Sequence, residues 1–451
     1  MKIMLNNIGK IHDVVLELNG ITAIAGENNT GKSTVGKALF TIFNSLYHLS
    51  QRVEKTKFSR ISMSIRDIFE KLNPDTSYFI NANNITRVIQ NNKERYLNDD
   101  SPYSVEEIFK LLKNNVDDDL SDDDDSVIIN KEMAQEIIEQ IRHISKISKK
   151  QVYMQFLGNR MNREFAKTIV NYHHPDDVSA IEMSIKNNTI RISIKENKID
   201  NVDGLMDLQT QAIYLDDPFV LDEVGKPTRL FLNNMFTRMR SYARSQFSPE
   251  NEATHREHLK ACLQEVPDDD MKSAIQQILV DDKIQKIIDK IDGVCHMESR
   301  QKEDGESEMM FFEEGKRKIP TENISTGLKT FLILKQLLYS GHLEENGLLI
   351  LDEPEVHLHP AWQILFAEII VLLQKEFGMH ILLTTHSPYF LRAIEVYSAR
   401  YHIADRCKYY LAELEEEDAV FEDVTISTDK IYQKLVLPFE KLQRMIYDEE
   451  K

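Results

Sequence analysis

The sequence predicts an α/β fold in which helices flank a central sheet, and three segments support this prediction. A glycine-rich loop at residues 26–33 lies between an apolar, strand-like run and a helical pattern. The run at residues 348–351 is short and apolar, as is typical of a strand that is covered on both faces. Residues 379–385 repeat this pattern about one strand-helix-strand unit later. Strands that alternate with helices in this way indicate a layered α/β domain.

The glycine-rich loop has the complete GxxxxGK[ST] pattern of a phosphate-binding loop. Residues 14–25 predict one strand that leads into it, and apolar residues at helical spacing in 35–46 predict a helix after it. The glycines would let backbone amides turn toward phosphate oxygens, and Lys32 would reach the β- and γ-phosphates. The predicted ATP-binding residues are continuous in sequence: Gly26, Glu27, Asn28, Asn29, Thr30, Gly31, Lys32, Ser33 and Thr34.

Polar residues also follow the two later strands. Asp352 ends the run at 348–351 and is placed to hold Mg²⁺ together with the Ser33 hydroxyl. Glu353 follows it and is placed to polarise the attacking water. His386 ends the third strand and can hydrogen-bond the γ-phosphate. The sequence therefore predicts ATP and Mg²⁺ as cofactors and Glu353 and His386 as catalytic residues.

Another polar segment, residues 323–329, reads NISTGLK and precedes an apolar helix that contains Phe331 and Leu334. Small polar residues at a helix start offer free backbone amides to a phosphate. An ordinary serine helix cap is the alternative interpretation.

Together these motifs resemble those of the ABC and SMC family of ATPases. The glycine-rich loop matches its Walker A motif, and residues 348–353 match Walker B. Residues 324–329 resemble the family's signature sequence, with Thr326 in place of a glycine, and His386 matches the switch histidine. The strings DEPEVHLHP and TTHSPYFL are similar to the RecF and overcoming-lysogeny-defect branch, which includes AAA15 ATPases of anti-phage defence loci.

The resemblance implies a P-loop NTPase of ABC type, with a mixed central sheet, flanking helices and helical insertions. In that family two heads enclose two ATP molecules, which implies a homodimer or a higher oligomer. The family's Q-loop glutamine has no obvious counterpart here: Asp216 or Asp217, after the apolar run at 212–215, either takes its place or forms only a turn. The signature residues implied to act in trans are Ser325, Thr326, Gly327 and Lys329.

The remaining sequence predicts insertions between the two parts of the head. Residues 178–196 alternate apolar and polar side chains around Asn187, as a hairpin does. The acidic run at 117–125 is predicted to be a solvated loop, with mimicry of a nucleic-acid backbone as the alternative. The predicted divisions are 1–50 (N-terminal part of the head), 51–175 (mainly helical insertion), 176–220 (strands that rejoin the head), 221–292 (helical lobe) and 293–451 (C-terminal part of the head).

Composition predicts a cytoplasmic protein without a membrane partner. The chain has 451 residues and three widely spaced cysteines, and it shows neither a signal-peptide pattern nor an apolar run of the roughly 18 residues that a membrane helix needs. A net charge of −19 argues against a broadly basic DNA-binding surface. Contact with nucleic acid is still possible at two local groups of basic residues. The first is Lys146, Lys149, Lys150, Arg160, Arg163 and Lys167, and the second is Arg238, Arg240 and Arg244.

The leading functional hypothesis is an ABC-type ATPase of bacterial anti-phage defence, similar in kind to the ATPases of Septu, PARIS and retron systems. It would sense a phage component or nucleic acid and control a separate effector, expected to be a nuclease. The tail after His386 is too short for the Toprim nuclease domain of the overcoming-lysogeny-defect proteins. The alternatives are a RecF-like repair ATPase that clamps DNA and a nucleotide-gated scaffold without significant turnover.

Overall fold

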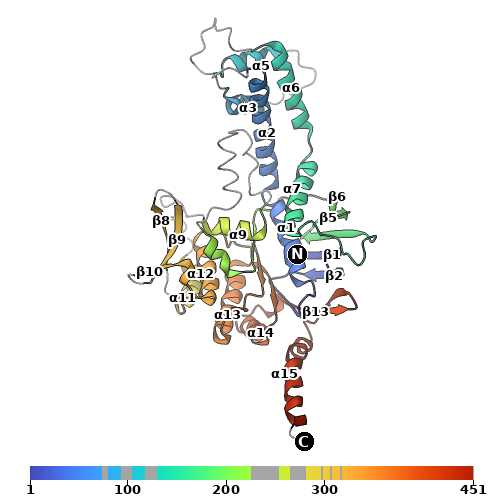
Figure 1. Ribbon diagram of the computed structural model, residues 1–451, viewed down its shortest axis with the longest axis vertical. Coiled ribbons are helices and arrows are strands. Elements are labelled where there is room, and N and C mark those ends of the chain that lie inside the picture. The colour runs from blue at the N-terminus through green and yellow to red at the C-terminus, as the bar shows by residue number, and fades with distance from the viewer. Residues whose placement is uncertain are drawn as a thin grey trace. The chain divides into compact units, whose positions relative to one another are not determined.

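The structure is a computed structural model that describes residues 1–73, 80–92, 104–116, 129–224, 253–264, 281–295, 298–304, 307–314 and 317–449. Figure 1 shows the order of the elements along the chain. The chain divides into two compact units. The first comprises Met1–Tyr47, Phe156–Pro227 and Glu250–Lys451, and the second comprises His48–Gln155 and Thr228–Pro249.

One large sheet organises the first unit. Within the described residues it has eleven strands, in the order β6-β5-β4-β1-β2-β14-β13-β3-β12-β11-β7. Its strands are β1 (Lys2–Ile8), β2 (Ile11–Glu17), β3 (Ile21–Gly26), β4 (Ser179–Ile185), β5 (Asn188–Lys195), β6 (Lys198–Asp203), β7 (Ala212–Leu215), β11 (Leu348–Asp352), β12 (His380–Thr385), β13 (Cys407–Glu415) and β14 (Asp418–Asp423).

The sheet has a parallel half and an antiparallel half, which confirms the predicted mixed sheet. Strands β13, β3, β12, β11 and β7 are parallel neighbours. Their apolar residues are buried, as expected for strands covered on both faces. Strands β6, β5, β4, β1 and β2 are antiparallel neighbours. Strand β14 joins the halves, because it is antiparallel to β13 and pairs with β2 in parallel at Ala419 and Ile11.

Helices of the first unit bury the apolar faces of the parallel half. Helices α13 and α14 pack against each other, and α11 packs against α12 and α13 (Figure 1). The rings of Phe331, Phe366 and Phe390 form part of this core. A separate sheet has the order β10-β9-β8. The remaining elements are α1 (Lys32–Leu46), η1 (Pro218–Glu223), α9 (His255–Gln264), α11 (Asp281–Asp292), β8 (Glu298–Asp304), β9 (Ser307–Glu314), β10 (Arg317–Pro320), η3 (Thr321–Asn323), α12 (Thr326–Tyr339), α13 (Pro360–Phe377), α14 (Pro388–Arg400), η4 (Ala404–Arg406) and α15 (Asp429–Glu449).

The second unit is helical in its described residues and has a core of its own. Its helices are α2 (Leu49–Leu72), α3 (Ala82–Asn91), α5 (Ser104–Lys113) and α6 (Lys131–Lys146), and α7 (Lys149–Glu164) contributes residues to both units. Apolar residues recur at helical spacing, as at Ile61, Ile65, Ile68 and Phe69, so each helix buries one face.

The prediction of one strand across residues 14–25 is wrong. The chain instead forms β2 and β3, which are not neighbours, since β14 and β13 lie between them. A turn separates the strands at Gly20, whose φ is +85°. A Cβ there would lie 2.6 Å from the carbonyl oxygen of Arg406, so the turn requires glycine. Asn-Gly is a turn signal even inside an apolar run.

The first predicted basic group is not one exposed face. Ile147 and Ser148 separate helices α6 and α7, and Lys167 lies beyond the end of α7, so the group is divided among two helices and a turn. Arg160 is buried, and Arg163 forms an ion pair with Glu257 at 2.7 Å. The basic residues therefore serve packing as well as solvation.

Several predictions lie outside the described residues. These are the acidic run at 117–125, the basic group Arg238, Arg240 and Arg244, and parts of the helical lobe predicted at 221–292. The predicted hairpin at 178–196 is confirmed by β4 and β5, which pair from Ser179 with Ile194 to Ile185 with Asn188. In the described part of the chain, no helix has the length and apolarity needed to cross a membrane.

Candidate functional site

The glycine-rich loop connects β3 to α1, in the predicted context of strand, loop and helix. At Gly26 a Cβ would lie 2.0 Å from the carbonyl oxygen of Ala412 on neighbouring β13, so no larger residue fits. Lys32 begins α1 and is buried. Its ammonium lies 2.5 Å from the carbonyl oxygen of Glu27 and 3.3 Å from both the Gly26 carbonyl and the Thr30 hydroxyl. The loop thus curls around the lysine head group.

Lys32 also lies in the field of three carboxylates beyond the loop. Burial lowers the pKa of Lys32, and the charges of Glu353, Asp352 and Glu355 oppose this by raising it. These three acidic residues come from the carboxyl end of β11 and the turn that follows. The structure therefore brings together a cation and an acidic cluster that lie about 320 residues apart in sequence.

Asp352 is oriented by two hydroxyl groups from the neighbouring strands. Tyr214 on β7 donates to its Oδ2 at 2.9 Å, and Thr384 on β12 donates to its Oδ1 at 2.5 Å. Each carboxylate oxygen keeps a further lone pair, and oxygen ligands are those that Mg²⁺ prefers. The donor set at Asp352 and Ser33 therefore fits a magnesium ion.

Glu353 and His386 face each other across the ends of β11 and β12. His386 Nε2 lies 2.9 Å from Glu353 Oε1. Burial and the nearby Lys32 charge lower the pKa of His386, while Glu353 raises it. Glu353 has a φ of +50°, and its backbone amide donates to the Thr384 hydroxyl at 3.0 Å. Such a strained backbone conformation in a polar cluster is typical of functional sites.

Glu355 ties the two strand ends together, and the sequence interpretation did not identify it. This carboxylate is buried, and its Oε1 accepts from the Thr385 hydroxyl at 2.6 Å. The same oxygen accepts from the backbone amides of His386 at 2.8 Å and Ser387 at 3.2 Å. Burial raises the pKa of Glu355. Glu355 thus holds the loop that carries His386.

A cavity of about 320 Å³ opens beside these groups. Ser33, Asp352, Glu353 and Asp216 all border it. It therefore unites the predicted metal-binding residues with the predicted general base. The full lining is Ser33, Leu215, Asp216, Asp217, Pro218, Thr330, Asp352, Glu353, Pro354, Val356 and His357.

The two aspartates after β7 have different roles in the structure. Asp217 caps η1, since its Oδ1 accepts from the Phe219 amide at 2.8 Å, which is a turn role. Asp216 instead contacts His255 Nε2 at 2.9 Å. Both aspartates therefore connect the cavity to helix α9, because Asp217 also forms an ion pair with Arg256 at 3.1 Å.

His255 lies at the centre of a partly buried polar cluster. Its Nδ1 is hydrogen-bonded to Glu164, and its ring stacks on Tyr214 with centroids 4.4 Å apart. Burial lowers the pKa of His255, but hydrogen bonds to Asp216 and Glu164 outweigh this and raise it to about 9. Tyr214 joins this cluster to Asp352. No local pattern in the sequence marks Tyr214 or His255 as site residues, because their partners are distant in the chain.

The predicted signature residues lie at the start of α12. Ser325 is exposed at the N-cap position, and its hydroxyl makes no capping hydrogen bond. Gly327 packs closely, since a Cβ there would lie 2.9 Å from the His357 carbonyl oxygen. Lys329 is buried, and its ammonium binds Asp222 at 2.6 Å. Neither Ser325 nor Thr326 lines the cavity that Asp352 borders.

Comparison with solved structures finds similarity to heads of SMC proteins. One is the SMC head bound to the C-terminal winged-helix domain of ScpA, at 11% identity and TM-score 0.42, covering 95% of this chain and 98% of that one. The SMC head domain from Thermotoga maritima matches at 8% identity and TM-score 0.37, and the match covers 94% of this chain and 98% of that one. A third is a Smc head with an extended coiled coil, bound to the C-terminal domain of ScpA from Pyrococcus furiosus. It matches at 11% identity and TM-score 0.38, and the match covers 100% of this chain and 99% of that one.

Comparison with protein families gives a match over most of the chain. The model of the AAA ATPase domain family matches residues 1–391. The match spans the glycine-rich loop, the end of β11 and His386. The chain therefore belongs to the AAA ATPase domain family.

Proposed function

We propose that this chain binds ATP with Mg²⁺ and hydrolyses it at the carboxyl ends of β3, β11 and β12. The observation that carries the proposal is the cavity shared by Ser33, Asp352 and Glu353, with the buried ammonium of Lys32 in the adjoining loop. Lys32 would bind the β- and γ-phosphates. Ser33 and Asp352 would hold Mg²⁺, which neutralises phosphate charge when bound.

Glu353 is the proposed general base for the attacking water. A general base must lie within hydrogen-bond reach of the proton that it removes, and Glu353 borders the cavity where the γ-phosphate would lie. His386 holds the Glu353 carboxylate at 2.9 Å. Asp352, fixed by Tyr214 and Thr384, is preorganised in the same cavity.

Nucleotide binding and phosphate release test this proposal. Lys32→Ala removes the cation that would bind the phosphates, so we expect loss of both Mg²⁺-ATP binding and turnover. Lys37→Ala is the matched control, because Lys37 lies on the same helix but outside the glycine-rich loop. If Lys32→Ala binds and hydrolyses ATP as the wild type does, the nucleotide site lies elsewhere.

We further propose that two copies pair through ATP, with Ser325 and Gly327 of one chain approaching the nucleotide of the other. This rests on the resemblance to ABC ATPases and is supported by the exposed, uncapped start of α12. Lys329 would act indirectly, because it already binds Asp222. Ser325→Arg should prevent ATP-dependent dimerisation in light scattering and leave ATP binding by the monomer unchanged. Loss of monomer binding would place Ser325 in its own chain's site.

The proposed cellular role is control of a separate effector, such as a nuclease, in anti-phage defence. It rests on the resemblance of the strings DEPEVHLHP and TTHSPYFL alone. Purification of the chain from its native cells, followed by mass spectrometry, tests it. An effector that is recovered with the wild type and changes its activity with Glu353→Gln would support the role. Stable recovery of DNA without an effector would favour the RecF-like alternative.

A further inference from the structure

A second cluster of ligand-type side chains lies in the antiparallel half of the large sheet. His12 is on β2, and His174 and Asp177 are in the segment that leads into β4. One ligand atom from each lies within 4.8 Å of the other two. Asp177 Oδ2 is 3.7 Å from His12 Nε2 and 3.8 Å from His174 Nδ1. Two segments that are distant in the sequence therefore point three polar side chains at one place.

A carboxylate outside this trio orients one of its members. His174 Nε2 lies 2.8 Å from Asp418 Oδ2, and Asn171 donates to the other oxygen of Asp418 at 3.1 Å. His174 thus turns its Nε2 toward Asp418 and its Nδ1 toward Asp177, at 3.8 Å. A carboxylate at Nε2 is the acceptor that leaves Nδ1 for a metal ion.

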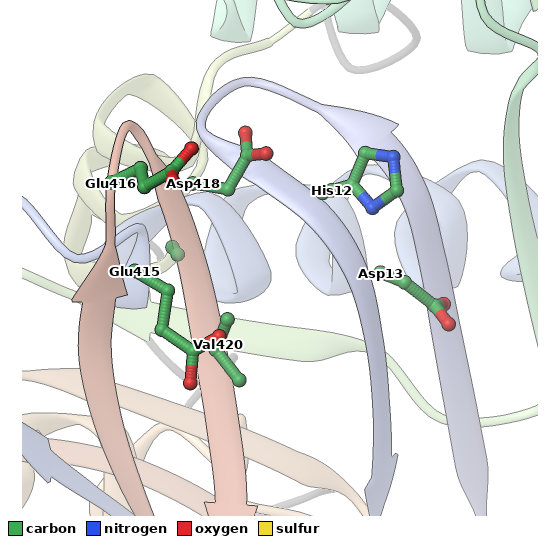
Figure 2. A pocket seen from close by; sticks show the side chains of 7 residues that line it. His12, Asp13, Glu415, Glu416, Asp418 and Val420 are labelled. Atoms are coloured by element: carbon green, nitrogen blue, oxygen red, sulfur yellow. The ribbon is translucent and has the colours of Figure 1, made fainter.

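This orientation is the one that metal-binding histidines usually have. A histidine that ligates a metal through one nitrogen generally donates its other N–H to a carboxylate or carbonyl group. Figure 2 shows Asp418 at the β13–β14 turn and His12 on β2 across the same pocket. Glu415 and Glu416 also border this pocket and add negative charge that attracts a cation.

The backbone that carries His174 and Asp177 is fixed by a buried side chain. Asn7 on β1 is 2% exposed. Its side-chain nitrogen, Nδ2, donates hydrogen bonds to the backbone carbonyl oxygens of His174 at 2.8 Å and Asp177 at 3.2 Å. It also donates to the Ser179 hydroxyl at 3.0 Å. Two of the three ligand residues are thereby positioned by the fold itself. Ordinary solvated side chains need no such support, whereas a binding site benefits from it.

We infer that His12, His174 and Asp177 bind a divalent transition-metal ion, with Zn²⁺ the ion that this ligand set suits best. Two imidazole nitrogens and a carboxylate oxygen match the ligands of zinc sites with an open fourth position. Tetrahedral ligands at about 2.1 Å from zinc lie about 3.4 Å from one another. The separations of 3.7 and 3.8 Å would close by a few tenths of an ångström, and that between the two histidines, which is within 4.8 Å, by up to about 1.4 Å. His12 and Asp177 are more than half exposed and can rotate to do so.

The ion would stabilise a region next to the glycine-rich loop. His12 follows Ile11, and Asp418 precedes Ala419. A Cβ on Gly31 would lie 3.0 Å from the Ile11 side chain and 3.5 Å from that of Ala419, so both residues pack against the loop. Zinc would join β2 to the segment before β4. We therefore expect zinc to raise the unfolding temperature of the nucleotide-free protein.

Calorimetric titration of the metal-free, nucleotide-free full chain with Zn²⁺ alone tests this inference. We expect one ion per chain with a Kd of about 1 μM or tighter, an affinity that falls on acidification because the ligating histidines must be deprotonated. The double variant His12→Ala, His174→Ala should lose this binding. Asp418→Asn, which removes the orienting charge, should weaken it by about 10- to 100-fold.

His173→Ala is the matched control, because His173 is next to His174 in sequence but outside the trio. It should bind Zn²⁺ as the wild type does. Circular dichroism before titration confirms that each variant is folded. The inference would be overturned if the wild type showed no saturable Zn²⁺ binding below about 100 μM, or if the double variant bound Zn²⁺ as tightly as the wild type. The cluster would then be a set of solvated ion pairs.

Discussion

The two halves of the large sheet hold their polar side chains in different ways. At the carboxyl ends of the parallel strands, Asp352 and Glu355 accept hydrogen bonds from Thr384, Thr385 and backbone amides, and Glu355 is 4% exposed. In the antiparallel half, the cluster of His12, His174 and Asp177 is more open, and the His12 side chain is more than half exposed. The first region is a continuous buried network, and the second is an open group held by a buried scaffold.

The difference follows from topology. Parallel strands all end at one edge, so the residues that follow β11 and β12 must meet there. Antiparallel strands alternate in direction, so a cluster between β2 and the segment before β4 depends on loops that no strand rule positions. We expect substitutions in the first region to cost more stability than those in the second.

The largest expected loss of stability is that of Glu355→Ala. It would leave the buried Thr385 hydroxyl and the partly buried His386 amide without their acceptor, at roughly 2 kcal/mol each, or about 4 kcal/mol in total. Urea denaturation measures this cost. Glu355→Gln is the control, because it keeps an acceptor oxygen and should cost about 1 kcal/mol. Equal losses for the two variants would show that the hydrogen bonds to the loop do not matter.

The next effect is a dependence of stability on pH at His255. Its pKa is raised to about 9 in the folded chain, against 6.5 as the ordinary value. A raised pKa stabilises the fold fully below the ordinary value, and this contribution is lost as pH rises through the folded value. We therefore expect a loss on the order of 3 kcal/mol between pH 6.5 and pH 9 and above.

His255→Gln removes the titrating group and is the comparison for this effect. Its free energy of unfolding should change less than that of the wild type across the same range of pH. Parallel curves for the two proteins would show that the cluster of His255, Asp216 and Glu164 is not the cause.

A smaller effect is expected for Tyr214→Phe, which removes only the hydroxyl that donates to Asp352. One neutral donor to a charged acceptor contributes about 1.5 kcal/mol, or about a tenfold change in an equilibrium or rate constant. We expect a corresponding fall in kcat at saturating Mg²⁺-ATP. If Tyr214 only fills space, kcat and the Mg²⁺ dependence of turnover will remain those of the wild type.

The smallest effect should come from the antiparallel half. In metal-free buffer, Asp418→Asn should reduce the free energy of unfolding by less than about 1 kcal/mol, since its pair with His174 is partly exposed. Thermal and urea unfolding measure this. A loss as large as that of Glu355→Ala would remove the distinction between the two halves.

The sequence predicted the parts of the site that lie in continuous segments. Lys32 and Asp352 were found because a loop pattern and a strand end mark them locally. Tyr214 and Glu355 were not, because their roles depend on contacts such as Tyr214 with Asp352, which lie 138 residues apart. His174 and Asp418 are 244 residues apart and carry no local pattern either. Long-range contacts of this kind are set by strand order, which residue spacing alone does not give.

Turnover by Glu353→Gln tests the central claim most directly, with Glu413→Gln as control because Glu413 does not border the cavity and pairs instead with Lys434. Nucleotide affinity and single-turnover phosphate release are measured on the same preparations. If Glu353 is the general base, the variant keeps its affinity for Mg²⁺-ATP, and its phosphate release is slower by a factor of about 100 or more. Equal rates in wild type and Glu353→Gln would contradict the assignment of ATP hydrolysis to the carboxyl ends of β11 and β12.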